Sequence, residues 1–122
     1  HFDDPALIVQ KLECERDGDL YCVRYQTFLG DRVTCFRLKG PHPIVTGSSV
    51  ASMERIEPDP TIQALRMDKH FDFGKFDFVV TPGGPVLLDT NKTVGGSRRM
   101  YFNPEMQAVL RYRAEGLYGY FK

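Results

Sequence analysis

The stretch that decides the fold is Phe73-Gly-Lys-Phe-Asp-Phe-Val-Val-Thr-Pro-Gly-Gly-Pro-Val-Leu-Leu-Asp-Thr-Asn91. It carries the most informative polar residues of the chain. Two apolar runs flank Pro82-Gly83-Gly84, which is the pattern of a β-hairpin. If these three residues form the loop, Asp77 lies directly opposite Asp89. A two-residue loop would instead place one of the two carboxylates among phenylalanines, where burial without a partner costs several kcal/mol. We therefore expect the three-residue loop.

The two faces of the expected hairpin differ in character because side chains alternate along a strand. The polar face contains Asp77, Val79, Leu87, Asp89 and Asn91, and the apolar face contains Phe76, Phe78, Val80, Val86 and Leu88. Facing carboxylates repel unless a cation lies between them, and Mg²⁺ accepts one or two carboxylates together with water and phosphate oxygens. The polar face therefore predicts a magnesium site of the kind that phosphoryl transfer uses, with Asp77, Asp89 and Asn91 as ligands. The alternative is an exposed polar face, whose acids are solvated or paired with a nearby cation: Lys75, Lys92 or Arg98.

The rest of the chain predicts an α+β domain with short turns between strands. Strands are expected over residues 6–12, 20–28 and 32–39, with turns at 13–19 and 29–31 and a loop at 40–49. Helices are expected after Asp59-Pro60, to about Lys69, and after Asn103-Pro104, because each pair offers an N-cap followed by proline in the first turn. A helical stripe follows the second start: Met106, Val109, Leu110 and Leu117. We expect a single domain, 1–122, in which helices pack on one face of an antiparallel sheet.

The composition argues against several classes of function. The 16 Lys and Arg residues balance 16 Asp and Glu residues, and zero net charge argues against a nucleic-acid-binding surface. No apolar run approaches the roughly 20 residues that span a bilayer. The three cysteines, Cys14, Cys22 and Cys35, have no CxxC pair and no zinc-ligand spacing with the histidines, which favours reduced thiols in a cytoplasmic protein. Because the first residue is His1 rather than methionine, we expect a piece of a longer chain.

The hairpin resembles the last strands of the ATP-grasp superfamily, in which an aspartate, a glycine turn and an acid-x-asparagine motif follow in this order. Here the pattern is Gly74-Lys-Phe-Asp77, then Pro82-Gly-Gly, then Val86-Leu-Leu-Asp89-Thr-Asn91. D-alanine–D-alanine ligases and ligases that add glutamate to ribosomal proteins carry the same constellation. The chain departs from the family pattern at two points. Asp89 stands where glutamate is usual, and Val94-Gly95 stands where Pro-Gly is usual.

The resemblance extends upstream and covers roughly residues 6 to 99. Val9-Gln10-Lys11-Leu12 is similar to the family strand whose backbone reads the adenine edge, so the resemblance implies that Gln10, Lys11 and Leu12 bind the nucleotide. The hairpin from Arg24 to Arg37 is similar to one whose arginines contact phosphates, which implies a catalytic role for both, since an arginine fork suits phosphate oxygens. Taken alone, either residue is as readily an arginine on a surface strand. The candidates for the ribose-binding acid are Glu15, Asp17 and Asp19.

The resemblance implies the carboxyl-terminal lobe of an ATP-dependent ligase with ATP and Mg²⁺ as cofactors. Such an enzyme activates a small carboxylate as an acyl-phosphate, which an amine or a thiol then attacks. In the family an amino-terminal lobe completes the phosphate grip, so this chain alone is expected to bind ATP weakly and without turnover.

Two alternatives to the ligase lobe stay open. One is a non-catalytic module that keeps the fold for interaction with another protein. The other is a standalone domain whose ATP cleft is completed by a partner chain, for example in a homodimer. The loop from Gly95 to Arg99 follows the expected metal ligands, and it either touches the acyl substrate or is plain surface.

Overall fold

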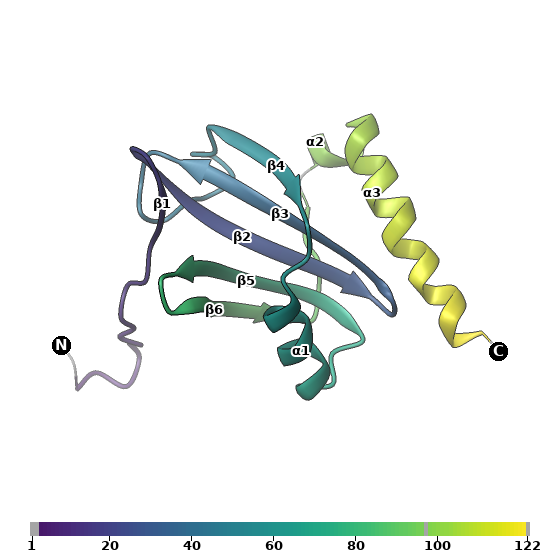
Figure 1. Cartoon of the computed structure of the whole chain (residues 1–122), viewed down its shortest axis with the longest axis horizontal. Helices are drawn as coiled ribbons and strands as arrows, with labels where there is room; N and C mark the ends of the chain where they lie inside the picture. Colours follow the sequence, from purple (N-terminus) through teal and green to yellow (C-terminus); the bar gives the residue numbers. More distant parts are fainter. Residues whose placement is uncertain (1–2, 97, 122) are drawn as a thin grey trace.

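The chain forms one antiparallel β-sheet with a helix on each side (Figure 1). The computed structural model describes residues 3–96 and 98–121, without the side chains of residues 99 and 100. The strands are β1 (Glu15–Asp17), β2 (Leu20–Leu29), β3 (Arg32–Gly40), β4 (Ser52–Ile56), β5 (Phe73–Thr81) and β6 (Gly84–Asn91). The helices are α1 (Pro60–Asp68), α2 (Arg98–Tyr101) and α3 (Pro104–Ala114), followed by the 3₁₀-helix η1 (Glu115–Tyr120).

The sheet is six-stranded, in the order β4-β3-β2-β5-β6, and β1 pairs with the start of β2. Every pair of strands is antiparallel. This confirms the predicted α+β class with an antiparallel sheet. No helix in the described part of the chain is long and apolar enough to cross a membrane.

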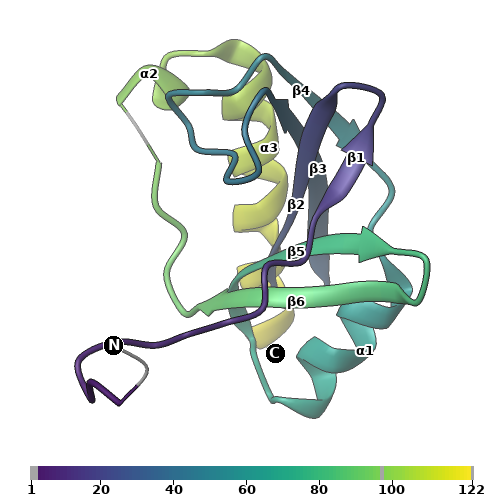
Figure 2. The same cartoon turned by 90° about the vertical axis from the view of Figure 1, so that its left-hand side faces the viewer.

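The helices α1 and α3 lie on opposite faces of the sheet, so the expectation that helices cover one face was wrong (Figure 2). The α1 face of the sheet packs against Ile62 and contains Phe28, Cys35, Phe76 and Phe78. The α3 face packs against Met106 and Val109 and contains Tyr25, Phe36 and Leu38. Because β2 and β3 carry large apolar side chains at both alternating sets of positions, each face needs its own cover.

The hairpin of β2 and β3 forms as predicted, around a two-residue turn at Gly30-Asp31. Gly30 has a φ of 57°, which glycine adopts without a steric penalty. In the register of this hairpin Arg24 lies opposite Arg37, and Tyr25 lies opposite Phe36. Tyr25 therefore points to the α3 face, and both arginines point to the α1 face.

The hairpin of β5 and β6 keeps the predicted pairing of Asp77 with Asp89, but it reaches that pairing differently. Thr81 pairs with Gly84, so the loop has two residues rather than the three expected. A bulge between Asp77 and Phe78 then shifts the register by one residue. As a consequence Leu87, predicted on the polar face, packs against the apolar core on the α1 face.

The amino-terminal part of the chain differs from the prediction. Residues 6–12, expected as a strand, have no strand hydrogen bonds, and Ile8 is 96% exposed. Part of the expected turn at 13–19 is instead β1, which pairs with β2. The edge strand β4 was not predicted, because nearly all its side chains are exposed and its sequence lacks an alternating apolar pattern.

Both predicted helix starts are confirmed, and their caps have the expected geometry. The Asp59 carboxylate accepts hydrogen bonds from the backbone N–H groups of residues 61 and 62 at 2.8 and 3.1 Å. Asn103 caps α3 in the same way. The stripe on α3 includes Met106 and Val109, but Leu117 is exposed, because the α-helix ends at Ala114 and η1 turns it away.

Candidate functional site

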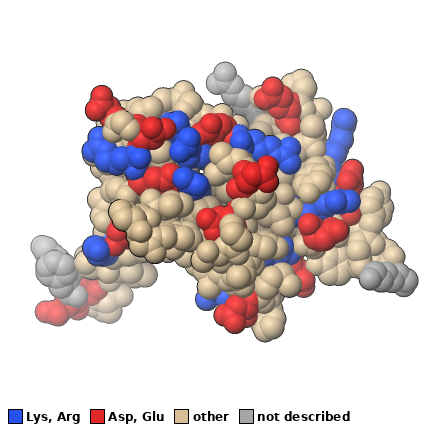
Figure 3. Space-filling model, viewed as in Figure 1, with Lys and Arg blue, Asp and Glu red and all other residues tan. Residues whose placement is uncertain are grey.

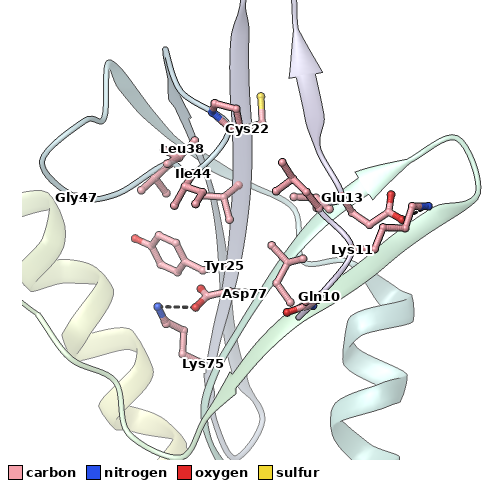
Figure 4. Close-up of a pocket in the computed structure, with 16 residues that line it drawn as sticks. Gln10, Lys11, Glu13, Cys22, Tyr25, Leu38, Ile44, Gly47, Lys75 and Asp77 are labelled. Carbon is pink, nitrogen blue, oxygen red and sulfur yellow. Dashed lines mark ion pairs between the residues drawn. The ribbon is translucent and has the colours of Figure 1, made fainter. Parts of the chain in front are cut away.

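A cavity of about 460 Å³ opens on the α3 face, between the amino-terminal segment, β2, β5 and the loop after β3. Figure 4 shows this cavity, with Gln10 and Lys11 of the amino-terminal segment across from Tyr25 and Asp77. The predicted nucleotide-binding residues Gln10, Lys11 and Leu12 all line this cavity, and so does the predicted metal ligand Asp77. Residues that are more than 60 positions apart in sequence are thus brought to one hollow.

Asp77 and Asp89 lie opposite each other across β5 and β6, and Asn91 follows on the same side of β6. The Asn91 amide nitrogen donates to Asp89 Oδ2 at 2.8 Å, and the Thr90 backbone N–H donates to Asp89 Oδ1 at 2.9 Å. All three predicted metal ligands are therefore neighbours in the strand register. Only Asp77 lines the 460 Å³ cavity, whereas Asp89 lines a separate hollow with Lys69 and Phe71. Asp77 is partly buried, whereas Asp89 is exposed.

Lys75 is the immediate partner of Asp77, with 2.9 Å between Lys75 Nζ and Asp77 Oδ2. The sequence already offered this lysine as an alternative partner for the acids, and alternation from β5 puts both on one face. Burial raises the pKa of the Asp77 carboxyl; the Lys75 ammonium lowers it, and the nearby Asp89 carboxylate adds to the rise. The site therefore holds a carboxylate whose charge is only partly compensated.

The donor set fits a hard divalent cation in its chemistry. Two carboxylates and one amide oxygen on one face are the oxygen ligands that Mg²⁺ accepts, leaving positions for water and phosphate. Within the described residues no group of three or more His, Cys, Asp or Glu side chains is close enough to hold a metal ion. The third ligand of the expected site is the amide of Asn91, so the fit rests on two acids and that amide.

The predicted catalytic arginines lie on the other face of the sheet and do not reach this cavity. Arg24 donates from Nε and Nη2 to the buried Glu15 carboxylate, at 2.7 to 3.1 Å. The same carboxylate accepts the Val80 backbone N–H at 2.8 Å, so it ties β1, β2 and β5 together. Arg37 is paired with Glu54 and belongs to a band of alternating charges over β1 to β4 (Figure 3).

The candidates for a ribose-binding acid are also outside the cavity. Glu15 is occupied by Arg24, and Asp17 is paired with Lys39. Asp19 does not line the cavity either, whereas Glu13 does. Glu13 is the acid that the sequence argument did not consider, and in the structure it pairs with Lys11 at 2.6 Å.

Tyr25 is the other polar residue of the cavity wall that sequence reasoning missed. Burial raises its pKa to about 12, so its hydroxyl stays protonated, and it donates a hydrogen bond to Met53 Sδ at 3.6 Å. Its place on the α3 face follows from alternation along β2, which is a signal that the sequence contains. Neither the sequence pattern nor the resemblance pointed to its proximity to Asp77, because that depends on the pairing of β2 with β5.

The three cysteines are free thiols. Burial raises the pKa of Cys35 to about 11, so this thiol is a packing residue rather than a nucleophile. The loop from Gly95 to Arg99 is described only in part: residue 97 and the side chain of residue 99 lie outside the described residues.

Comparison with protein-family models finds no match to this chain, and no curated protein matches it in sequence.

Proposed function

We propose that this chain is the nucleotide- and magnesium-binding lobe of an ATP-grasp ligase, which activates a carboxylate with ATP for attack by an amine or a thiol. One observation carries the proposal. The residues expected to read the adenine and the aspartate expected to hold Mg²⁺ line the same cavity, although they come from opposite parts of the sequence. Perturbed titratable groups in a cavity are typical of functional sites.

The metal site within this proposal consists of Asp77, Asp89 and Asn91. Bound Mg²⁺ would neutralise charge on the nucleotide phosphates. It would also relieve the repulsion between the two facing carboxylates. Lys75 pairs with Asp77 and lines the same cavity, so it is a cation that could contact a phosphate there. Arg24 and Arg37 are not part of the proposed site, because their guanidinium groups are held by carboxylates on the α1 face.

The test is calorimetric titration of Mg·ATP into the purified chain and into Asp89→Ala. We expect the wild type to bind Mg·ATP weakly and Asp89→Ala to bind it with an affinity lower by about tenfold or more. A tenfold change in affinity corresponds to about 1.4 kcal/mol, and a metal ligand contributes at least that. Asp68→Ala is the matched control, because Asp68 is exposed in the last turn of α1 and does not line the cavity of Asp77. Asp89→Glu restores the residue usual in the family and should bind at least as well as the wild type.

Two results would contradict the proposal. One is the absence of any magnesium-dependent ATP binding by the wild type, and the other is unchanged binding by Asp89→Ala. The chain alone is also expected to show no ligase turnover, because the phosphate grip of a second lobe is not part of this site. Turnover by the isolated chain would show that the site is more complete than we propose.

The amino-terminal segment favours a version in which a further lobe completes the cleft. Leu7, Ile8 and Val9 are 54%, 96% and 64% exposed and lie next to the cavity-lining Gln10. An exposed apolar run of this kind is typical of a surface that meets another element. If a second copy supplies that element, light scattering should give the mass of a dimer, and Ile8→Glu should return it to the mass of a monomer.

A further inference from the structure

A second cavity, of about 550 Å³, lies between α3, the α3 face of the sheet and the loop that follows β6. Most of its wall is apolar, with Leu38, Val94 and Val109 among its residues. Its volume is within the range of small-molecule sites. Tyr25 and Lys75 line both this cavity and the one that contains Asp77, so the two hollows adjoin.

Arg113 is the charged group that distinguishes this second cavity. It comes from the last turn of α3 and is half-buried in the cavity wall. Within the described residues its side chain has neither a carboxylate partner nor a hydrogen-bond acceptor, in contrast to Arg24, Arg37 and Arg66. Burial lowers the pKa of Arg113, and among the described residues the tyrosines Tyr25 and Tyr101 act in the opposite direction.

The Arg113 nitrogens are not among the fully buried unpaired polar atoms of the described residues, so the guanidinium remains accessible to a ligand. A partly desolvated guanidinium without a counter-ion in the structure is favourably placed to bind an anion. A carboxylate fits best, because two parallel N–H groups match two carboxylate oxygens. The apolar wall around it asks for an equally apolar body on the same molecule.

We propose that this second cavity binds a carboxylic acid with an apolar body, its carboxylate held by Arg113, and that this acid is the acyl substrate of the ligase. The assignment as substrate rests on the proposed function, whereas the binding itself does not. The shared residues Tyr25 and Lys75 put the carboxylate end beside the cavity of Asp77, where the transferred phosphoryl group would be.

The experiment is calorimetric titration of octanoate into the full chain without nucleotide, with octanol as the uncharged probe of the same length. We expect saturable binding of octanoate, weakened about tenfold or more in Arg113→Gln, as for loss of a hydrogen-bonded charge pair. Arg111→Gln is the matched control, because Arg111 is on the same helix and exposed. Arg113→Lys keeps the charge without the fork, so it should bind with intermediate affinity, and its thermal unfolding should match the wild type.

The outcomes separate this inference from the function. No saturable octanoate binding, equal binding of octanol, or wild-type affinity in Arg113→Gln would overturn the inference while leaving Mg·ATP binding as a separate result. Octanoate binding together with absent Mg·ATP binding would support the acid site and overturn its assignment as an acyl-substrate site. If Arg113→Gln does not fold, the Arg113→Lys variant is used instead. Wild-type affinity of Arg113→Lys for octanoate would then contradict the bidentate contact between Arg113 and the carboxylate.

Discussion

Arg66 joins three segments of the fold through its guanidinium group, and its replacement by methionine is the sharpest test of the structure. The side chain is 2% exposed, and its hydrogen-bond acceptors among the described residues are backbone carbonyls rather than carboxylates. Its Nε donates to the Phe71 carbonyl at 2.7 Å, and Nη2 donates to the Gly30 and Asp72 carbonyls at 2.7 and 3.3 Å. The guanidinium carbon lies 4.2 Å from the centroid of the Phe28 ring. Arg66 thus holds the β2–β3 turn against the chain that leads into β5.

The expected loss of unfolding free energy in Arg66→Met depends on which carbonyl acceptors lose their hydrogen-bond donor. The Asp72 carbonyl keeps the Gly30 backbone N–H at 2.9 Å, whereas those of Gly30 and Phe71 keep no other donor among the described residues. Each buried carbonyl left unpaired costs about 1–3 kcal/mol, and the lost contact with the Phe28 ring adds about 0.5–2 kcal/mol. Nη1 of Arg66 is itself buried without an acceptor in the described part of the chain. Its removal offsets about 1–3 kcal/mol, so we expect Arg66→Met to lose about 3 kcal/mol of about 5–15.

Urea denaturation followed by far-UV circular dichroism measures this loss. For an m-value of about 1.5–3 kcal/mol/M the midpoint should fall by roughly 1 to 2 M. Arg111→Met is the control, because Arg111 is exposed on α3 and should change the free energy of unfolding by less than about 0.5 kcal/mol. A loss below about 1 kcal/mol in Arg66→Met would refute the reasoning, since it would mean that the two carbonyls do not depend on the guanidinium.

Three further substitutions test the hairpin, a cap and the site. A Cβ at Gly74 would overlap the Asn91 carbonyl oxygen, so Gly74→Ala should lose about 1–3 kcal/mol in urea denaturation and weaken Mg·ATP binding; wild-type values for both would contradict the register. Asp59→Ala should lose about 1 kcal/mol in the same assay, because two N–H groups of α1 lose their acceptor, and Asp59→Asn should lose much less. Because burial raises the pKa of Asp77, the folded state holds a proton more tightly than the unfolded state, and this group's contribution to stability falls as pH rises through that window. The difference in thermal stability between Asp77→Asn and the wild type should therefore shift in favour of Asp77→Asn as the pH rises above about 4, the ordinary pKa of an aspartate, and a difference that does not change with pH would count against it.

The predicted pairing of Asp77 with Asp89 was right for a reason that the sequence contains, although the turn was wrong. Two constraints act on this hairpin. Near Asp77 the two flanking phenylalanines must be buried, which fixes which residues point inward. Near the turn, Pro82-Gly83 closes a two-residue loop with the Thr81 hydroxyl donating to the Gly84 carbonyl at 3.0 Å. The register that buries the phenylalanines and the register that the two-residue turn imposes differ by one residue. The bulge between Asp77 and Phe78 accommodates this difference.

The arginines show the limit of the same reasoning. Alternation within one hairpin assigns relative faces, so the sequence does establish that Arg24 and Arg37 lie together. Which of the two faces of β5 they share depends on the register between β2 and β5, where Arg24 lies opposite Phe78. No turn links these two strands directly, and α1 and two other strands intervene in the chain. A shift of one residue there would put Arg24 beside Asp77, so the motif alone could not decide the role of this arginine.

The candidate site combines features that a purely structural hairpin would avoid. Like charges directly opposite each other in a sheet are destabilising, and one of this pair is partly buried. Lys75 compensates Asp77, yet the net pKa of that carboxyl remains raised, so the compensation is incomplete. Replacing the two acids by threonine and valine would satisfy the same register at lower cost. Such unfavourable electrostatics next to a cavity is expected where a bound cation compensates the two carboxylates. Binding of that cation would then raise the free energy of unfolding above that of the free chain.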